Sequence, residues 1–162
     1  MKRTLALVTA LAVVLAVGVM AQGKTDFSGT WKRDATRSDA PQMGRGGAGG
    51  GAPAGDVTMT IAQTASDITI ERKMGETAMK SVYKLDGSES VNPGARGGDV
   101  KSKAKWEGAT IVIESTQTMS MGGNEMTITS KEIWSLADGA ITVVATRTTP
   151  RGEMTTKTVY VK

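Results

Sequence analysis

The sequence predicts an all-β protein, folded as an antiparallel, up-and-down β-barrel of about eight to ten strands. Three observations carry this prediction. Apolar and polar residues alternate along most of the chain after residue 22, glycine-containing turn signals separate the alternating runs, and no segment there has a convincing helical repeat. The chain has 162 residues, and the 141 that follow a predicted leader suit one domain, which buries roughly two-thirds of the surface of its unfolded chain.

The N-terminus has the pattern of a secretory signal peptide. Two basic residues follow Met1, an apolar segment runs from Leu5 to Val19, and Ala21 is the small residue expected at a cleavage site. The uncharged run is close to the roughly 20 residues that a membrane-spanning helix needs, so an uncleaved anchor is the alternative. We expect residues 1–21 to be removed and residues 22–162 to form a secreted or periplasmic monomer without a membrane span.

The composition excludes several kinds of site. The chain has no cysteine and no histidine, which rules out disulfides, a lipid-anchored cysteine, imidazole zinc sites and serine–histidine triads. The net charge of +4 falls to +2 without the leader's two basic residues, which favours no particular charged partner. The acidic residues fall mainly at turns or on outward-facing positions, and no phosphate-cradling motif is present. We therefore expect no enzymatic activity, no metal and no cofactor.

The first predicted strand contains Ser28-Gly29-Thr30-Trp31, directly behind the leader. A Gly-x-Trp at this place indicates a small closed barrel in which the tryptophan plugs one end. We assign structural roles to Trp31, to its neighbour Phe27 and to Trp134. Later strands are indicated by alternating residues that share one face: Val57, Met59 and Ile61; Ile68 and Ile70; Val100, Ser102, Ala104 and Trp106; Met126, Ile128, Trp134 and Leu136; and Ile141, Val143 and Ala145.

Two tight hairpin turns are predicted, at Glu107-Gly108 and Asp138-Gly139, because both central residues of a type I′ turn need positive φ. Further reversals are expected at Gly75, Gly87, Gly122-Gly123 and Pro150–Gly152. The tight turns predict which residues oppose one another across the strands: Trp106 and Ala109, Ala104 and Ile111, Lys101 and Glu114, Leu136 and Ile141, Trp134 and Val143, and Ser130 and Arg147.

Two glycine-rich segments interrupt the alternation. Residues 41–55 contain seven glycines, two prolines and one charge, and residues 92–98 form a shorter stretch. Neither buries enough apolar surface to offset the entropy lost on ordering, so we expect flexible loops, with 41–55 dispensable for folding. Each contains one Arg-Gly-Gly, but without flanking aromatic residues this does not predict a nucleic-acid partner.

Two further clusters have a simple explanation and a functional alternative. Met119, Met121 and Met126 flank one predicted hairpin, where three thioethers would suit copper(I), although methionine also fills gaps in cores. Lys101, Lys103 and Lys105 form a basic strip, which we interpret as a solvated strand face, with attachment to anionic surfaces as the alternative.

The segment Asp26–Lys32 resembles the opening of lipocalin and fatty-acid-binding barrels. Nearly the whole mature chain resembles small exported lipocalin-like proteins of bacteria, through short motifs at Phe27–Trp31, Lys105–Gly108 followed by Ile111–Ile113, Glu132–Gly139 and Val159–Lys162. The resemblance implies a barrel with an interior cavity and names no cargo.

The chain departs from the fatty-acid-binding pattern in two places. Those barrels typically end with Arg-x-Tyr, whose arginine grips the lipid carboxylate, whereas here Thr158 stands two residues before Tyr160. The glycine-rich segment 41–55 also replaces the helical lid between the first two strands. Both differences argue against fatty-acid binding in the family's usual manner.

Parity places two opposite charges, Glu132 and Arg147, inside the barrel as diagonal neighbours. Such a pair braces the barrel, anchors a ligand, or supplies a catalytic carboxylate, unless a local bulge turns both side chains outward, and the sequence leaves the choice open. The candidate ligand contacts are Glu132, Arg147, Tyr83, Trp106, Ser130 and Tyr160. We expect the barrel to bind a small, partly apolar molecule. The alternative is an envelope structural or interaction module with a filled core and no cargo.

Overall fold

The computed structural model describes residues 24–40, 56–95, 97–121 and 124–162, with residues 121 and 124 described by their backbone alone. The predicted leader and the segment 41–55 lie outside the described residues. The described part is all-β and contains no helix, which confirms the predicted fold class. Its ten strands are β1 (Gly29–Asp34), β2 (Val57–Gln63), β3 (Asp67–Met74), β4 (Thr77–Lys84), β5 (Asp86–Pro93), β6 (Asp99–Glu107), β7 (Thr110–Met121), β8 (Asn124–Ala137), β9 (Ala140–Thr149) and β10 (Gly152–Val161).

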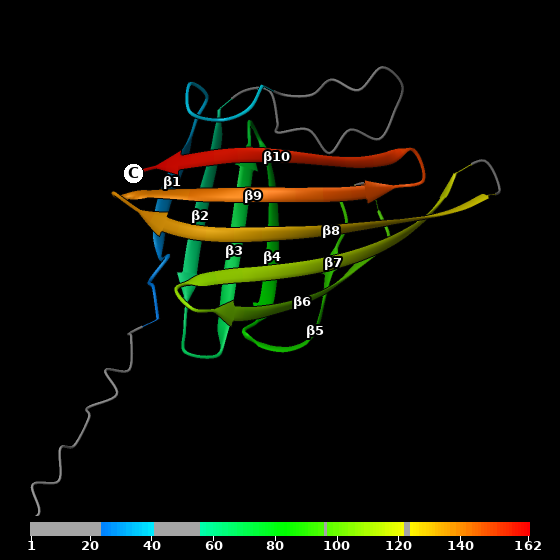
Figure 1. The fold of residues 1–162 in the computed structure, drawn as a ribbon, viewed down its shortest axis with the longest axis horizontal. Helices are drawn as coiled ribbons and strands as arrows, with labels where there is room; N and C mark the ends of the chain where they lie inside the picture. Colours follow the sequence, from blue (N-terminus) through cyan, green and yellow to red (C-terminus); the bar gives the residue numbers. More distant parts are fainter. Residues whose placement is uncertain (1–23, 41–55, 96, 122–123) are drawn as a thin grey trace, which may run out of the picture.

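The strands form two crossing layers (Figure 1). Strands β6 to β10 run side by side across the front, and β1 to β4 run behind them at a steep angle. The order in the sheet is β4-β3-β2-β1-β10-β9-β8-β7-β6-β5, and the strands of each paired set run antiparallel. Apart from β1 and β10, all neighbours in the sheet are also neighbours in the sequence. This is the up-and-down order, curled into a nearly closed barrel.

Side chains of β5 close the seam between the two end strands, β4 and β5. Asn92 accepts a hydrogen bond from the Val82 backbone N–H at 2.7 Å and donates one to the Val82 carbonyl at 3.0 Å. Ser90 accepts a hydrogen bond from the Lys84 backbone N–H at 3.0 Å. Both polar side chains are buried. These two side chains therefore form hydrogen bonds with backbone groups of β4 that a neighbouring strand would otherwise pair.

One of the two predicted hairpin registers is confirmed and the other is wrong by two residues. Between β8 and β9, Leu136 opposes Ile141 and Ser130 opposes Arg147, and both turn residues have positive φ. Between β6 and β7, Trp106 opposes Ile111 instead of Ala109, because the turn consists of Gly108 and Ala109. Only Gly108 has positive φ there, as in turns with glycine at the first central position. A shift of two residues keeps every side chain on its predicted face.

The N-terminal segment and Trp31 pack one end of the barrel. Phe27 is 0% exposed and Trp31 is 2% exposed, and the Trp31 Nε1–H donates a hydrogen bond to the Phe27 carbonyl at 3.0 Å. The Gln63 side chain accepts a hydrogen bond from the Phe27 N–H at 3.1 Å and donates one to the Thr25 carbonyl at 2.9 Å. Trp106 lies against Phe27, with the ammonium of Lys24 5.7 Å from its ring. Trp31 and Phe27 are therefore buried together at this end of the barrel.

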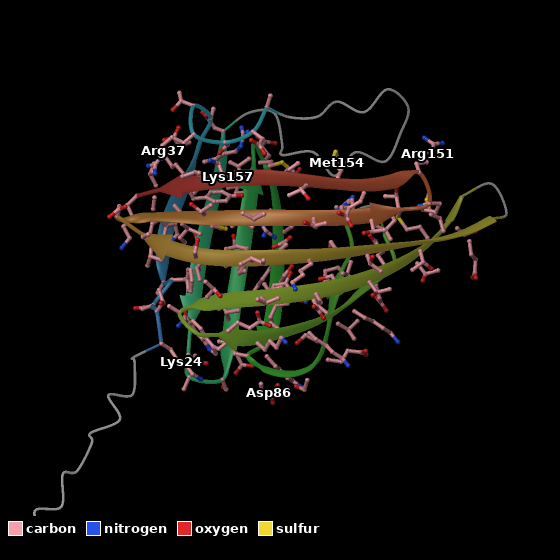
Figure 2. The ribbon with its side chains drawn as sticks, in the orientation of Figure 1. Lys24, Arg37, Asp86, Arg151, Met154 and Lys157 are labelled. Carbon is pink, nitrogen blue, oxygen red and sulfur yellow. The ribbon has the colours of Figure 1, made fainter. Side chains whose placement is uncertain are left out.

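Inward-facing side chains towards the other end are only partly buried. They have the same parity as the core residues on their strands, yet solvent reaches them: Met79, Ser81, Ser115, Ser130, Ala145, Arg147 and Met154. In Figure 2, Lys24 lies below the strands and Met154 lies on β10 near the top. The interior is thus packed at one end and accessible at the other. Among the residues that the structure describes, no helical segment is long and apolar enough to cross a membrane.

Candidate functional site

An ion pair crosses the barrel interior between the two layers. The guanidinium Nη2 of Arg72, on β3, lies 3.5 Å from the Oε2 of Glu132, on β8. The side chains are 31% and 28% exposed, so the pair is shielded but not sealed from solvent. It lies at the boundary between the packed end and the accessible end, where a molecule entering from the open side would meet a charge.

Trp134 fixes both members of this pair. Its indole Nε1–H donates a hydrogen bond of 2.9 Å to the same Oε2 of Glu132, and the Arg72 guanidinium lies over its ring at 5.4 Å. Trp134 is 0% exposed and is also part of the core, where it opposes Ile111 and Val143. A rigid aromatic plane therefore orients the carboxylate by hydrogen bonding and the guanidinium by a cation–π contact.

Two tyrosines complete the cluster. Burial raises the pKa of both Tyr83, on β4, and Tyr160, on β10, and the negative charge of Glu132 acts in the same direction. Burial by itself would lower the pKa of Arg72, but Glu132 and the two phenols outweigh it, and the pKa of Arg72 is raised. The cluster thus combines a permanently charged guanidinium, a carboxylate and two phenols that keep their protons near neutral pH.

The local register explains why these groups meet. Arg72 continues the inward face of Ile68 and Ile70, so its long side chain leaves the packed part of β3 and extends over the interior. Glu132 lies two residues before Trp134 on β8 and opposes Ile113 and Ala145 on the neighbouring strands. Each charge therefore has apolar neighbours in its own layer and finds its partner in the opposite one.

The inner faces of the described strands have an excess of positive charge. Three arginines, Arg33, Arg72 and Arg147, have the parity of buried Trp31, Ile70 and Val143 on their strands, and Glu132 has that of Trp134. Arg33 lies directly opposite Tyr160, and its buried Nε has no hydrogen-bond partner. The Arg33 Nη2 donates a hydrogen bond to the Asp39 carbonyl at 3.0 Å.

The predicted partner of Glu132 is wrong. Arg147 opposes Ser130, as expected, but the ion pair of Glu132 is with Arg72, which the sequence interpretation did not consider. Arg147 and Ser130 instead lie in an inward row that continues from Ser102 and Ser115 to Met154. The hydroxyls of Ser102 and Ser115 are 2.8 Å apart. The row therefore lines the accessible half of the barrel interior with polar groups.

The other predicted contacts fall into two groups. Tyr83 and Tyr160 lie in the cluster around Arg72, whereas Trp106 lies at the sealed end against Phe27. The sequence did contain a signal that Arg72 faces inwards: this residue continues the alternation of Ile68 and Ile70. It reaches Tyr160 from another strand.

A groove of about 660 Å³ lies across strands β5 to β10, lined by outward-facing charged residues together with Ser102, Ser115 and Ser130 of the inward row. Its charged lining residues have the parity opposite to the core and are exposed. They comprise three lysines and three glutamates: Lys101, Lys103, Lys131, Glu89, Glu114 and Glu153. Lys101 lies 4.0 Å from Glu89 and Lys131 lies 3.9 Å from Glu114. The basic strip is therefore part of a charge-balanced outer face.

The methionine hairpin is described only in part. Met119 and Met126 oppose each other on β7 and β8, and the side chain of Met121 lies outside the described residues. The described part of the chain contains no group of three or more acidic side chains placed to hold a metal ion.

Comparison with known proteins shows the fold. No protein-family model and no curated protein matches the sequence. Among solved structures, a zebrafish ileal bile acid-binding protein in complex with cholic acid has a TM-score of 0.59 at 15% identity, over 84% of this chain and 98% of that one.

Two other solved structures have the same architecture. A secretory abundant heat soluble protein from Ramazzottius varieornatus has a TM-score of 0.58 at 14% identity, over 84% of this chain and 94% of that one. The REP1-NXSQ fatty acid transporter has a TM-score of 0.54 at 12% identity, over 83% and 94%. The described strands therefore form a barrel of the lipocalin and fatty-acid-binding type.

Proposed function

We propose that this protein binds a small amphipathic molecule between its two strand layers, with an anionic head group at Arg72 and an apolar body towards the open end. The observation that carries this proposal is the Arg72–Glu132 pair, which lies inside the barrel and remains about one-third exposed. A pair that served only the core would be expected to be packed over by its neighbours, because partly hydrated charges gain little from each other.

The chemistry of the cluster suits an anion. A guanidinium presents donors in a planar fork that matches a carboxylate or sulfonate, and the hydroxyls of Tyr83 and Tyr160 lie beside it. Arg33 and Arg147 add positive charge on the same inner surface. The interior thus offers an oxyanion both a direct partner and a favourable surrounding field.

The accessible half suits an apolar body of variable shape. Partly exposed methionines on inward-facing positions, Met79 on β4 and Met154 on β10, supply much of its apolar surface. Methionine side chains are flexible and polarizable, and they adapt to differently shaped ligands. The known proteins of this architecture include a bile acid-binding protein and a fatty acid transporter, which is consistent with amphipathic acids as the ligand class.

A head-group series tests the proposal. Dodecanoate, dodecanol and dodecylamine share one apolar chain and differ in charge, and their binding is measured by isothermal titration calorimetry. We expect dodecanoate to bind most strongly. Arg72→Met should weaken dodecanoate binding by about tenfold or more, since a hydrogen bond to a charged group contributes roughly 1.5 to 3 kcal/mol. Dodecanol is neutral and forms no ion pair with Arg72, so its binding should change little.

Lys73→Met is the matched control, because it removes one positive charge from the next residue of the same strand, which faces outwards and is exposed. Equal binding of the three ligands, or equal losses in both variants, would show that Arg72 does not receive the head group. No binding by any amphipath would favour the alternative, an envelope structural or interaction module without cargo.

We also propose that the protein is exported and acts outside the cytoplasm, on the strength of the N-terminal signal pattern. Expression of the full chain in a bacterial host, followed by mass measurement of the protein from the periplasm and medium, tests this. Loss of residues 1–21 supports export with cleavage, and retention of the full mass in the membrane fraction supports the uncleaved anchor.

A further inference from the structure

We propose that Glu132 is a built-in competitor for the ligand's anionic head: it holds Arg72 in the empty barrel and takes up a proton when an anion replaces it there. This inference rests on the proposed function and concerns the regulation of the same site. It makes binding of an anion depend on pH through one residue.

The geometry of the pair allows displacement. The contact between Arg72 Nη2 and Glu132 Oε2 measures 3.5 Å, which is longer than the roughly 2.7 to 2.9 Å of a strong charge-assisted hydrogen bond. A guanidinium has five N–H donors, so the contacts with Glu132, Tyr83 and Tyr160 leave some of them for another oxyanion. The empty barrel thus holds Arg72 in place without saturating it.

Glu132 has a second partner that stays when Arg72 is lost. Its Oε2 accepts the Trp134 Nε1–H at 2.9 Å, and Trp134 lies on the same strand and the same face. Trp134 is 0% exposed and does not move freely. The carboxyl group therefore stays close to Arg72 when a ligand binds, and does not swing out to bulk water.

An arriving anion would then face a second carboxylate at short range. Two like charges at one site disfavour each other, and the usual result is that one of them binds a proton. The charged and titratable groups that face Glu132 are Arg72 on β3, Tyr83 on β4 and Tyr160 on β10, with Arg33 on β1 and Arg147 on β9 further along the inner surface.

Among these groups Glu132 is the one suited to accept the proton. The arginines are already protonated, and the two phenols keep their protons near neutral pH because burial raises their pKa. If the ligand's head is a sulfonate, the ligand itself does not titrate in this range. The step is then balanced as follows: one proton from the buffer binds an oxygen of the Glu132 carboxylate, and the sulfonate takes the place of that carboxylate beside Arg72.

The test uses anilinonaphthalenesulfonate, a fluorescent dye whose sulfonate remains ionised across the range studied. Its dissociation constant is measured from about pH 5 to about pH 8 for the native chain, Glu132→Gln and Glu114→Gln. The third protein is the control, because Glu114 lies on the outer face and pairs with Lys131. We expect native affinity to rise as pH falls, and Glu132→Gln to bind about tenfold more tightly at the upper end with a flat pH profile. Glu114→Gln should behave like the native chain.

A second measurement needs no variant. Calorimetric titrations of the native protein in two buffers with different ionisation enthalpies count the protons taken up on binding. Net proton uptake on binding at the lower end of the range supports the inference, because a tenfold preference for the protonated carboxyl changes its pKa by one unit, and no uptake there overturns it. Equal affinity of Glu132→Gln and the native chain would also overturn it.

The two proposals fail in different ways. If Arg72→Met abolishes dye binding but Glu132→Gln does not strengthen it, the site receives anions and Glu132 is only a structural partner. If neither the native chain nor Glu132→Gln binds the dye, the proposed function fails, and this inference fails with it.

Discussion

The Arg72–Glu132 pair makes a quantitative prediction about stability that is independent of any ligand. Arg72→Met and Glu132→Gln each remove one charge while keeping much of the side-chain volume, and the double variant removes both. Two unit charges about 4 Å apart interact by roughly 4 kcal/mol in the effective dielectric of a protein surface. Fully exposed pairs give only about 0.2 to 1 kcal/mol.

The observed pair lies between these limits, because its side chains are 31% and 28% exposed at a separation of 3.5 Å. We therefore expect a coupling free energy of about 1 to 2 kcal/mol, after discounting for solvent screening. Each single variant should lose about 1 to 3 kcal/mol, because it leaves one charge in the interior with fewer partners. The double variant should lose less than the sum of the two.

Urea unfolding followed by tryptophan fluorescence measures these differences, provided that the slope against urea is the same in all variants. The control cycle uses Lys131→Met and Glu114→Gln, an outer-face pair at 3.9 Å with side chains 48% and 59% exposed. Coupling in the interior pair no larger than in this outer pair would refute the argument. It would mean that water screens the interior as fully as it does the outer face.

Three further predictions concern the barrel itself. Trp31→Ala should destabilise the protein by about 3 to 5 kcal/mol, as other buried large-to-small changes do, and an unchanged melting temperature would contradict its role as a plug. Asn92→Ala should cost about 1 to 3 kcal/mol and speed hydrogen exchange at the Val82 amide, because both backbone groups of Val82 lose their partner; unaltered exchange there would show that the seam is held in another way. Burial raises the pKa of both tyrosines in the folded state, so their contribution to stability is fully present below the unfolded value of about 10 and is lost as pH rises through the folded values. Because the chain has only two tyrosines, phenolate absorbance should titrate at higher pH in the native protein than in urea, and coincident curves would contradict their burial.

The parts of the fold that depend on local chemistry followed from the sequence. The alternation of Val57, Met59 and Ile61 placed an inward face on β2 correctly, because a strand repeats every two residues whatever it packs against. The Asp138-Gly139 turn set the register of β8 and β9, since positive φ at both positions leaves one tight geometry. At Gly108 a single positive φ allowed the turn to shift by one residue, and the predicted register was off by two.

By itself, the sequence determined that Glu132 faces inwards and that its charge needs a partner in the interior. Parity is a local property, and the cost of an isolated charge in an apolar surrounding is the same for any fold. Only the tertiary structure decided that the partner is Arg72. Arg147 lies on the strand next to Glu132, so the pairing of neighbouring strands predicts that the two residues are close. Arg72 lies in the other layer, and its distance from Glu132 depends on how the two layers cross. That crossing comes from the twist and packing of all ten strands together, which no short segment of the chain encodes.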